Sequence, residues 1–159
     1  MKEIKLTQGK FAIVDDEDFE ELSKYRWCYK DGYATRGIAA GVRRRTTLLM
    51  HVVIIGKVNG LETDHINGNG LDNRRENLRH VTSSQNQQNR ASCKNTSSQY
   101  KGVHWSKANK NWTSHIRIAG EKHHLGIYGS ELEAAIAYNE AAQRLFGEYA
   151  RLNIVKEMM

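Results

Sequence analysis

Residues 63–69 read Thr63-Asp64-His65-Ile66-Asn67-Gly68-Asn69, and Asn77-Leu78-Arg79 and then Asn86 follow. These residue types suit the hydrolysis of a phosphodiester, which needs an activated water, neutralised charge at the phosphate and help for the leaving oxygen. The side chain of His65 has a pKa near neutrality, so it can take a proton from water. Asp64 offers a carboxylate oxygen and Asn86 an amide oxygen, which is how proteins usually hold Mg²⁺.

Taken singly, the same residues have other interpretations. An Asp-His pair beside Asn-Gly repeats is also typical of a plain turn, in which Asn and Asp side chains bond to the local backbone. Asn86 alone is equally a solvated residue of a polar helix. In extended backbone Asp64 and His65 would face opposite ways, so a shared site requires a turn or an irregular strand end. The glycines that follow them permit such a turn.

The chain before this motif is predicted to be rich in strands. Apolar residues form the run 11–14, and residues 25–29 and 33–38 flank Asp31-Gly32, a dipeptide that suits a tight hairpin turn. A short helix is expected over residues 18–24. Residues 46–55 are β-branched and apolar and are predicted to form one buried strand.

After the motif, the pattern changes from turns to a sheet and a helix. Residues 60–82 are turn-rich and end in a strand at 78–81, and a polar helix is expected over 83–91. The polar residues 92–98 form the best candidate linker. Three strands are predicted at 100–106, 112–118 and 122–128. Ser130 and Glu133 form a capping box for a helix with one alanine-rich apolar stripe, which stops at Gly147.

Composition places the chain among globular proteins, and its charge is compatible with contact to nucleic acid. It has 159 residues, of which 39% are hydrophobic and 26% charged, and a net charge of +6. Positive charge is concentrated centrally, with Arg43, Arg44 and Arg45 together, and both ends are acidic. Such a distribution fits contact with phosphate, although many solvated surfaces share it. No apolar run is long enough for a membrane span and residues 1–5 lack the apolar core of a signal peptide, so we expect a cytoplasmic protein of a bacterial or phage-infected cell, with no membrane partner.

Residues 48–90 resemble the HNH homing-type endonucleases of phages and mobile introns. The resemblance rests on Met50-His51, residues 63–69, Leu71-Asp72-Asn73-Arg74, Glu76-Asn77-Leu78-Arg79, Val81-Thr82, Asn86 and Asn89. It implies a small ββα-metal nuclease core in which His65 is the general base and Asp64 and Asn86 bind one Mg²⁺ or Mn²⁺ per active site. It implies that Asn77 holds the catalytic loop in shape. His51 matches a residue that contacts phosphate or has a structural role, and Asn89 is an alternative to Asn86.

Residues 99–153 resemble the DNA-binding domain of plant ethylene-response (APETALA-type) factors. The resemblance covers residues 100–103, Trp105, Trp112, Ile116-Arg117, Leu125-Gly126, Tyr128 and much of the helix to Asn153. It implies a three-stranded antiparallel sheet packed on one helix, with DNA contacts from Lys101, His104, Trp105, Lys107, Trp112, Arg117 and Lys122. Each Trp has core packing as its alternative. His104, His115 and His124 replace the usual Arg, Glu and Trp, so the plant base preference does not transfer.

Together these features predict an α+β chain organised as a strand-rich segment at 1–47, an HNH nuclease at 48–91, a linker at 92–98 and a sheet-plus-helix DNA-binding domain at 99–155. The expected function is metal-dependent cleavage of double-stranded DNA by phosphodiester hydrolysis. The alternatives are a DNA-binding regulator with an inactive HNH site and an RNA-binding structural protein. The target site, the oligomeric state, with a monomer as the default, and the role of residues 1–47 are left open.

Overall fold

The structure is a computed structural model that describes residues 1–39, 45–92 and 96–155. The chain forms two compact units, Met1–Ser83 and Ser84–Met159. The predicted linker at 92–98 lies within the range of the second unit, and the predicted domain bounds stay predictions. None of the helices in the described part of the chain has the length and hydropathy needed to cross a bilayer.

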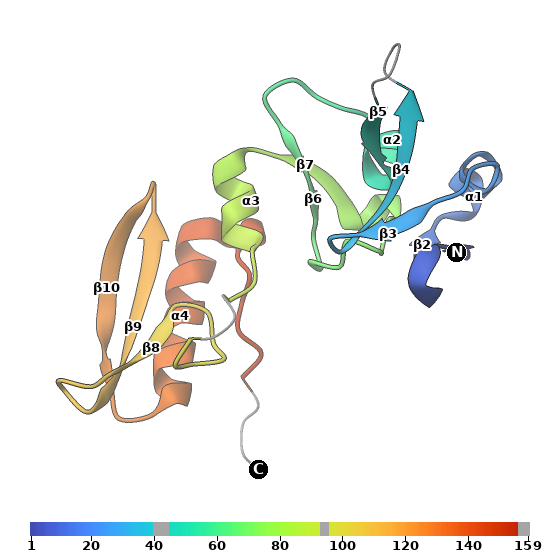
Figure 1. The fold of residues 1–159 in the computed structure, drawn as a ribbon. Coiled ribbons are helices and arrows are strands. Elements are labelled where there is room, and N and C mark those ends of the chain that lie inside the picture. Colours follow the sequence, from blue (N-terminus) through green and yellow to red (C-terminus); the bar gives the residue numbers. More distant parts are fainter. Residues whose placement is uncertain (40–44, 93–95, 156–159) are drawn as a thin grey trace. The chain divides into compact units, whose positions relative to one another are not determined.

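The first unit begins with a hairpin, a short helix and a three-stranded sheet (Figure 1). The elements are β1 (Lys2–Lys5), η1 (Thr7–Gly9), β2 (Phe11–Val14), α1 (Asp16–Ser23), β3 (Cys28–Lys30), β4 (Tyr33–Ala39) and β5 (Arg45–Leu49). Asp31 and Gly32 join β3 to β4 with φ of 52° and 91°, and positive φ at both positions is what a two-residue type I′ turn requires. The expected hairpin is therefore confirmed.

The predicted single strand over 46–55 is wrong in its second half. Strand β5 ends at Leu49, and α2 (Met50–Ile55) follows it. Met50 and Ile54 are both buried, one helical turn apart, and Gly56 ends the helix with φ of 76°. A short continuous apolar run fits a buried strand and a buried helix equally, so its pattern did not separate the two.

A second hairpin carries the motif residues. It consists of β6 (Glu62–His65) and β7 (Leu78–Val81), which pair antiparallel with His65 opposite Leu78 and Asp64 opposite Arg79. The loop between them ends in η2 (Arg75–Asn77), and α3 (Ser83–Asn89) follows the hairpin. Strand β7 and helix α3 confirm the predicted elements at 78–81 and 83–91, the helix ending earlier than expected. Strand β6 was not predicted.

The core of the first unit joins its N-terminal segment to the motif segment. Trp27 is 1% exposed and belongs to the same cluster of buried side chains as Leu22, Met50, Ile54 and Leu78. The indole Nε1 donates a hydrogen bond of 2.9 Å to the Leu22 carbonyl oxygen. Residues before position 40 therefore supply much of the apolar surface on which α2 and β7 pack.

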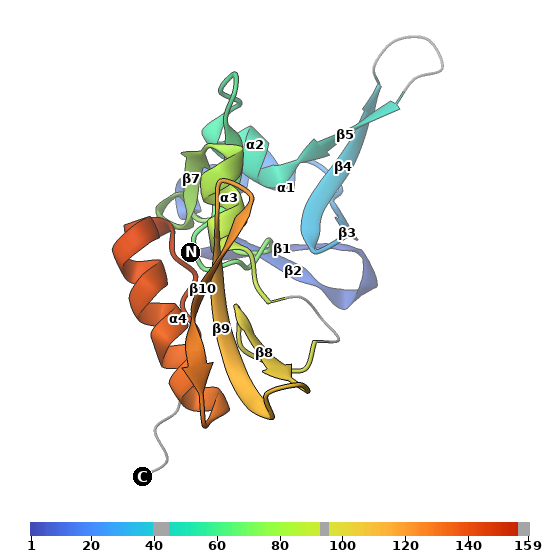
Figure 2. The same cartoon turned by 90° about the vertical axis from the view of Figure 1, so that its left-hand side faces the viewer.

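The second unit is an antiparallel sheet with one helix packed on it (Figure 2). Its elements are β8 (Val103–Ser106), β9 (Asn111–Ile118), β10 (Glu121–Tyr128), α4 (Glu131–Phe146) and η3 (Gly147–Tyr149), with β9 in the middle of the sheet. Ser130 and Glu133 form the predicted capping box. Gly102 has φ of +79°, and a Cβ there would lie 2.1 Å from a ring carbon of Tyr138, so only glycine lets the helix lie this close.

Candidate active site

His65 is the last residue of β6 and is surrounded by two rings and one amide. It is 5% exposed, and its Nε2 lies 3.4 Å from Oδ1 of Asn73, which is fully buried. The ring centroid of His51, on α2, lies 4.9 Å away with the planes at 86°, and that of Tyr33, on β4, lies 5.8 Å away. Helix α2, strand β4 and the hairpin loop thus place side chains around one imidazole.

Burial keeps both imidazoles of this group neutral at neutral pH. It lowers the pKa of His65 below the ordinary value, against the opposing effects of the hydrogen bond to Asn73 and the charges of Asp64 and Asp72. Burial, followed by the proximity of His65, lowers the pKa of His51 to about 4. Among the described residues, His51 Nδ1 has no hydrogen-bond partner. A neutral His65 has a lone pair that can accept a proton, which is what a general base needs.

Asp64 lies beside His65 in β6 and is paired with the cross-strand residue Arg79. Asp64 is 6% exposed, and its Oδ2 accepts hydrogen bonds of 3.0 Å from both Nε and Nη2 of Arg79. A buried carboxylate is costly without such a partner, so the pairing with Arg79 offsets the burial of this side chain. Neighbouring strand residues point to opposite sides of a hairpin, and Asp64 and His65 accordingly have different partners.

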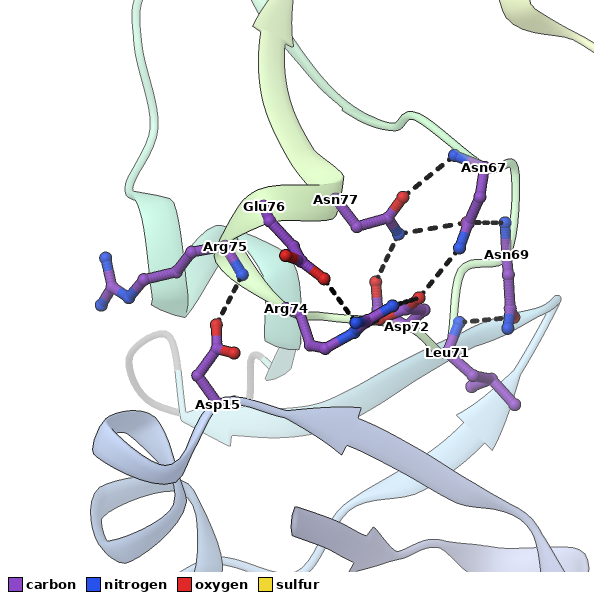
Figure 3. A network of polar contacts seen from close by, with 9 residues as sticks. All are labelled: Asp15, Asn67, Asn69, Leu71, Asp72, Arg74, Arg75, Glu76 and Asn77. Carbon is purple, nitrogen blue, oxygen red and sulfur yellow. Dashed lines mark hydrogen bonds and ion pairs between the residues drawn. The ribbon is translucent and has the colours of Figure 1, made fainter. Parts of the chain in front are cut away.

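Asn77 closes the loop between the two strands through side-chain contacts (Figure 3). Its Oδ1 accepts a hydrogen bond of 3.0 Å from the backbone N–H of Asn67, and its Nδ2 donates to the Asp72 carbonyl oxygen at 2.7 Å and to Asn67 Oδ1 at 3.1 Å. Asn67 Nδ2 in turn donates to Asp72 Oδ2 at 2.8 Å. Hydrogen bonds of its own amide side chains therefore fix the conformation of the loop that follows His65.

The N-terminal segment also binds this loop, through hydrogen bonds and an ion pair. The Ile13 N–H donates to Leu71 O and the Asn73 N–H donates to Ile13 O, both at 2.8 Å, so β2 runs beside the loop. The backbone N–H of Arg75 donates to Asp15 Oδ2 at 2.8 Å (Figure 3), and its guanidinium pairs with Asp18 at 2.7 Å. Arg74 pairs with Asp72 and Glu76.

Asn86 and Asn89, the alternative amide ligands, lie on α3. Asn86 is half-buried and Asn89 is 6% exposed. Both belong to the second unit, whereas Asp64 and His65 belong to the first, so a shared ion stays a prediction. Across residues 1–39, 45–92 and 96–155 no three His, Cys, Asp or Glu side chains gather as a metal-binding group. A carboxylate with an amide oxygen nevertheless fits the preference of Mg²⁺ for hard oxygen donors.

The residues predicted to contact DNA in the second unit lie in different places. Arg117 is opposite Lys122 and His115 is opposite His124, which puts these four on one face of the sheet because direct partners share a face. The His104 ring lies 5.1 Å from that of His115, and Ile116, between Arg117 and His115, packs on α4 instead. Burial lowers the pKa of His115 to about 4 and also lowers the pKa of His104, so Arg117 and Lys122 supply the positive charge here. This face, with His104, His115, Arg117, Lys122 and His124, is named the cationic sheet face below.

Other predicted contacts lie outside the cationic sheet face. Trp112 packs beside Ala134 and Ala135 of α4, which is the core-packing alternative, and Trp105 stacks edge-on against it while remaining 39% exposed. The Lys101 ammonium donates to the Gln88 carbonyl oxygen, and burial lowers its pKa to about 8. Lys107 is exposed in the turn after β8. These contacts stay predictions.

Arg43 and Arg44 lie outside the described residues, and Arg45 begins β5. Sequence reasoning missed Tyr33, Asn73 and Arg79 as members of the site. Arg79 belongs to the motif quoted above, but its spacing does not predict the pairing with Asp64. That pairing follows from the antiparallel register of β6 and β7. Tyr33 is far from the motif in sequence and carried no signal of its own.

The hairpin, its amide-rich loop, the buried Asp-His pair and the helix that follows define the HNH class of domain. The HNH endonuclease family model matches residues 49–88. An uncharacterized HNH endonuclease of Acanthamoeba polyphaga mimivirus is 34% identical over 148 residues, which is 92% of this chain and 76% of that protein. The chain therefore belongs to the HNH endonuclease family.

Two further relatives match parts of the chain. Protein 3.8 of Escherichia phage T7 is 31% identical over 93 residues, which is 58% of this chain and 75% of that protein. Dehydration-responsive element-binding protein 2C of Arabidopsis thaliana is 42% identical over 57 residues, which is 35% of this chain but only 16% of the plant protein. No solved structure matches.

Proposed function

We propose that this protein is a metal-dependent endonuclease that cuts DNA by hydrolysing phosphodiester bonds. The observation that carries the proposal is the buried imidazole of His65 next in sequence to the buried carboxylate of Asp64, on a hairpin whose loop is held by hydrogen bonds to amide side chains and to β2. A rigid base and an anionic oxygen donor at one strand end suit attack of water on a phosphate. Membership of the HNH endonuclease family supports the same chemistry.

In the proposed reaction, His65 takes a proton from water as the water oxygen forms its bond to phosphorus. The bond from phosphorus to the leaving sugar oxygen breaks, and that oxygen ends with a proton from solvent. Asp64 and Asn86 would hold one Mg²⁺ or Mn²⁺ in a ββα-metal arrangement, with Asn89 as the alternative to Asn86. When bound, such an ion neutralises charge on the phosphate and the leaving oxygen. His51 either contacts phosphate or supports His65, and Asn77 keeps the loop in shape.

We further propose that cleavage is of the homing type and that a monomer nicks one strand. Two of the matched relatives come from a mimivirus and a phage, which agrees with the resemblance to the homing-type endonucleases of phages and mobile introns. Each chain carries a single proposed active site, which supports one cut per binding event. Sequencing the ends of products from a randomised DNA pool would identify the target, and products with paired cuts would contradict nicking by a single copy.

The second unit is proposed to bind duplex DNA with an APETALA-type sheet. Its three antiparallel strands carry the cationic sheet face on one side and α4 on the other. The similarity to the Arabidopsis element-binding protein supports this assignment. Cations in such a position contact phosphate or guanine edges, and the acidic residues Glu131 and Glu133 lie in the first turn of α4, on the opposite layer.

One charge removed from the cationic sheet face should reduce the salt dependence of DNA binding. We expect Arg117→Ala to lower the slope of log affinity against log salt concentration by about 0.9, because each phosphate contact releases about one counterion. Arg144→Ala is the matched control, since Arg144 is also exposed but lies in the last turn of α4. Fluorescence anisotropy with labelled duplex at several salt concentrations measures both slopes. Equal slopes for the two variants would place the DNA elsewhere.

The cleavage proposal is tested by supercoiled plasmid with and without divalent metal. We expect relaxation with Mg²⁺ or Mn²⁺ and none with EDTA, because the phosphate charge is then not neutralised. Binding of duplex without relaxation in either metal would favour the alternative, a DNA-binding regulator with an inactive site. Preferential competition by RNA over duplex DNA would favour the RNA-binding alternative. Relaxation that persists in EDTA would contradict metal dependence.

A further inference from the structure

We propose that Tyr33, supplied by the N-terminal segment, is a positioning residue that fixes the orientation of the His65 ring. The inference rests on the proposed role of His65 in hydrolysis. Tyr33 lies outside residues 49–88, which the family model matches, yet its ring is in the same aromatic group as His51 and His65. The segment before the matched motif would thus contribute a side chain directly to the site.

The rings of Tyr33, His51 and His65 each contact the other two. The Tyr33 centroid lies 5.5 Å from that of His51 and 5.8 Å from that of His65, and the two imidazoles are 4.9 Å apart. The contacts of His51 with Tyr33 and with His65 are edge-to-face, at 70° and 86°, and the Tyr33 ring is tilted by 43° to that of His65. Ring contacts at these distances are attractive and depend on ring orientation. On the polar side, His65 Nε2 faces Asn73 Oδ1. The imidazole is thus restrained by rings and by an amide, while Tyr33, 40% exposed, is the outermost ring.

The position of Tyr33 is itself fixed by backbone on two sides. It is the first residue of β4, directly after the tight turn at Asp31-Gly32. Gly70, in the loop that follows His65, packs against it. A Cβ built on Gly70 would lie 2.6 Å from Cδ1 and 2.7 Å from Cε1 of Tyr33, and 2.5 Å from the Gly32 carbonyl oxygen. The loop backbone therefore lies directly on the ring, and no side chain larger than hydrogen fits between them.

Loss of this ring should affect the chemical step more than DNA binding. A general base acts only when its lone pair is aimed at the water, and a displacement of about 1 Å can cost roughly 100-fold in rate. We expect Tyr33→Ala to lower the single-turnover cleavage rate about 10- to 100-fold at saturating enzyme, with DNA affinity unchanged. Tyr33→Phe keeps the ring and should retain most of the rate.

Gly70→Ala provides an independent test that removes no side chain of the site. Its new methyl group would meet both the Tyr33 ring and the Gly32 carbonyl oxygen, so the loop and the ring must move apart, and we expect a loss in rate like that of Tyr33→Ala. Gly37→Ala is the matched control, because Gly37 lies in the same strand as Tyr33 and its Cβ would meet nothing within 4 Å. Tyr25→Ala controls for removal of a comparably exposed tyrosine, 42% against 40%. Circular dichroism checks that each variant is folded.

A double variant separates this inference from the proposed function. In a His65→Ala background, Tyr33→Ala should cause no further loss of rate, because a positioning residue acts only through the residue that it positions. An inactive His65→Ala together with full activity in folded Tyr33→Ala and Gly70→Ala would overturn the role of Tyr33 and leave the proposed function standing. A Tyr33→Phe rate as low as that of Tyr33→Ala would overturn the role of the ring. Full activity in His65→Ala would contradict the proposed function itself.

Discussion

Replacement of His65 by alanine is expected to slow DNA cleavage about 10²- to 10⁴-fold while DNA affinity stays unchanged. The reason is that the imidazole is buried, neutral and restrained, so its contribution is that of a preorganised base and not of a charge that attracts DNA. The rate is measured as single-turnover nicking of plasmid in Mg²⁺, and the affinity as binding in the absence of metal.

His80→Ala is the matched control for this variant. His80 lies on β7, in the same hairpin, and its Nε2 is 3.1 Å from the Ile55 carbonyl oxygen, a backbone atom and not a ring of the His65 group. We expect the control to keep most of the activity. Added imidazole should partly restore cleavage in His65→Ala, because the truncated side chain leaves space for a soluble base. Equal losses in both variants would show that the hairpin, and not the base, had been damaged.

Replacement of Trp27 by alanine is expected to lower the free energy of unfolding of the first unit by about 3–5 kcal/mol. The indole is 1% exposed, belongs to the core shared with Met50 and Leu78, and donates a hydrogen bond to Leu22. Small domains have only about 5–15 kcal/mol in total, so the nuclease unit should become marginal and cleavage should be lost with it.

Urea denaturation followed by far-ultraviolet circular dichroism measures this change. Trp105→Ala is the control, because that indole is 39% exposed and should cost far less. Since the chain has two compact units, we expect the Trp27 variant to shift one of two transitions and leave the other in place. An unchanged denaturation profile would mean that residues before position 40 are not part of the folded nuclease unit.

Local sequence rules predicted the elements that local interactions determine. The turn at Asp31-Gly32 and the capping box at Ser130 follow from backbone conformation and one side-chain contact, and both are present. Strand β6 was missed because Glu62-Thr63-Asp64-His65 is polar and its alternation cannot be seen by hydropathy. Helix α2 was missed because a buried helix and a buried strand of this length look alike.

For the site, motif spacing identified the residues of the hairpin but not their surroundings. The loop contacts of Asn77 fit the role that the motif predicts for it, since all of them lie within residues 67–77. The Tyr33 ring contacts the His65 ring only because β4 and the hairpin loop pack together. Asn73 is held in place by the hydrogen bond from its backbone N–H to the Ile13 carbonyl oxygen. Contacts of this kind depend on tertiary structure, which one sequence without its fold does not reveal.

The bonds between Ile13 and the loop at 71–73 have a consequence for recombination of this chain with its relatives. A recombination event that transferred only the family segment 49–88 would carry His65 but leave behind strand β2, which contacts its loop, and the indole of Trp27, which fills its core. We therefore expect the smallest block that keeps these contacts and the proposed ligand Asn86 to run from residue 1 through the end of α3. Exchange of the sheet and helix that follow should be tolerated only after that point.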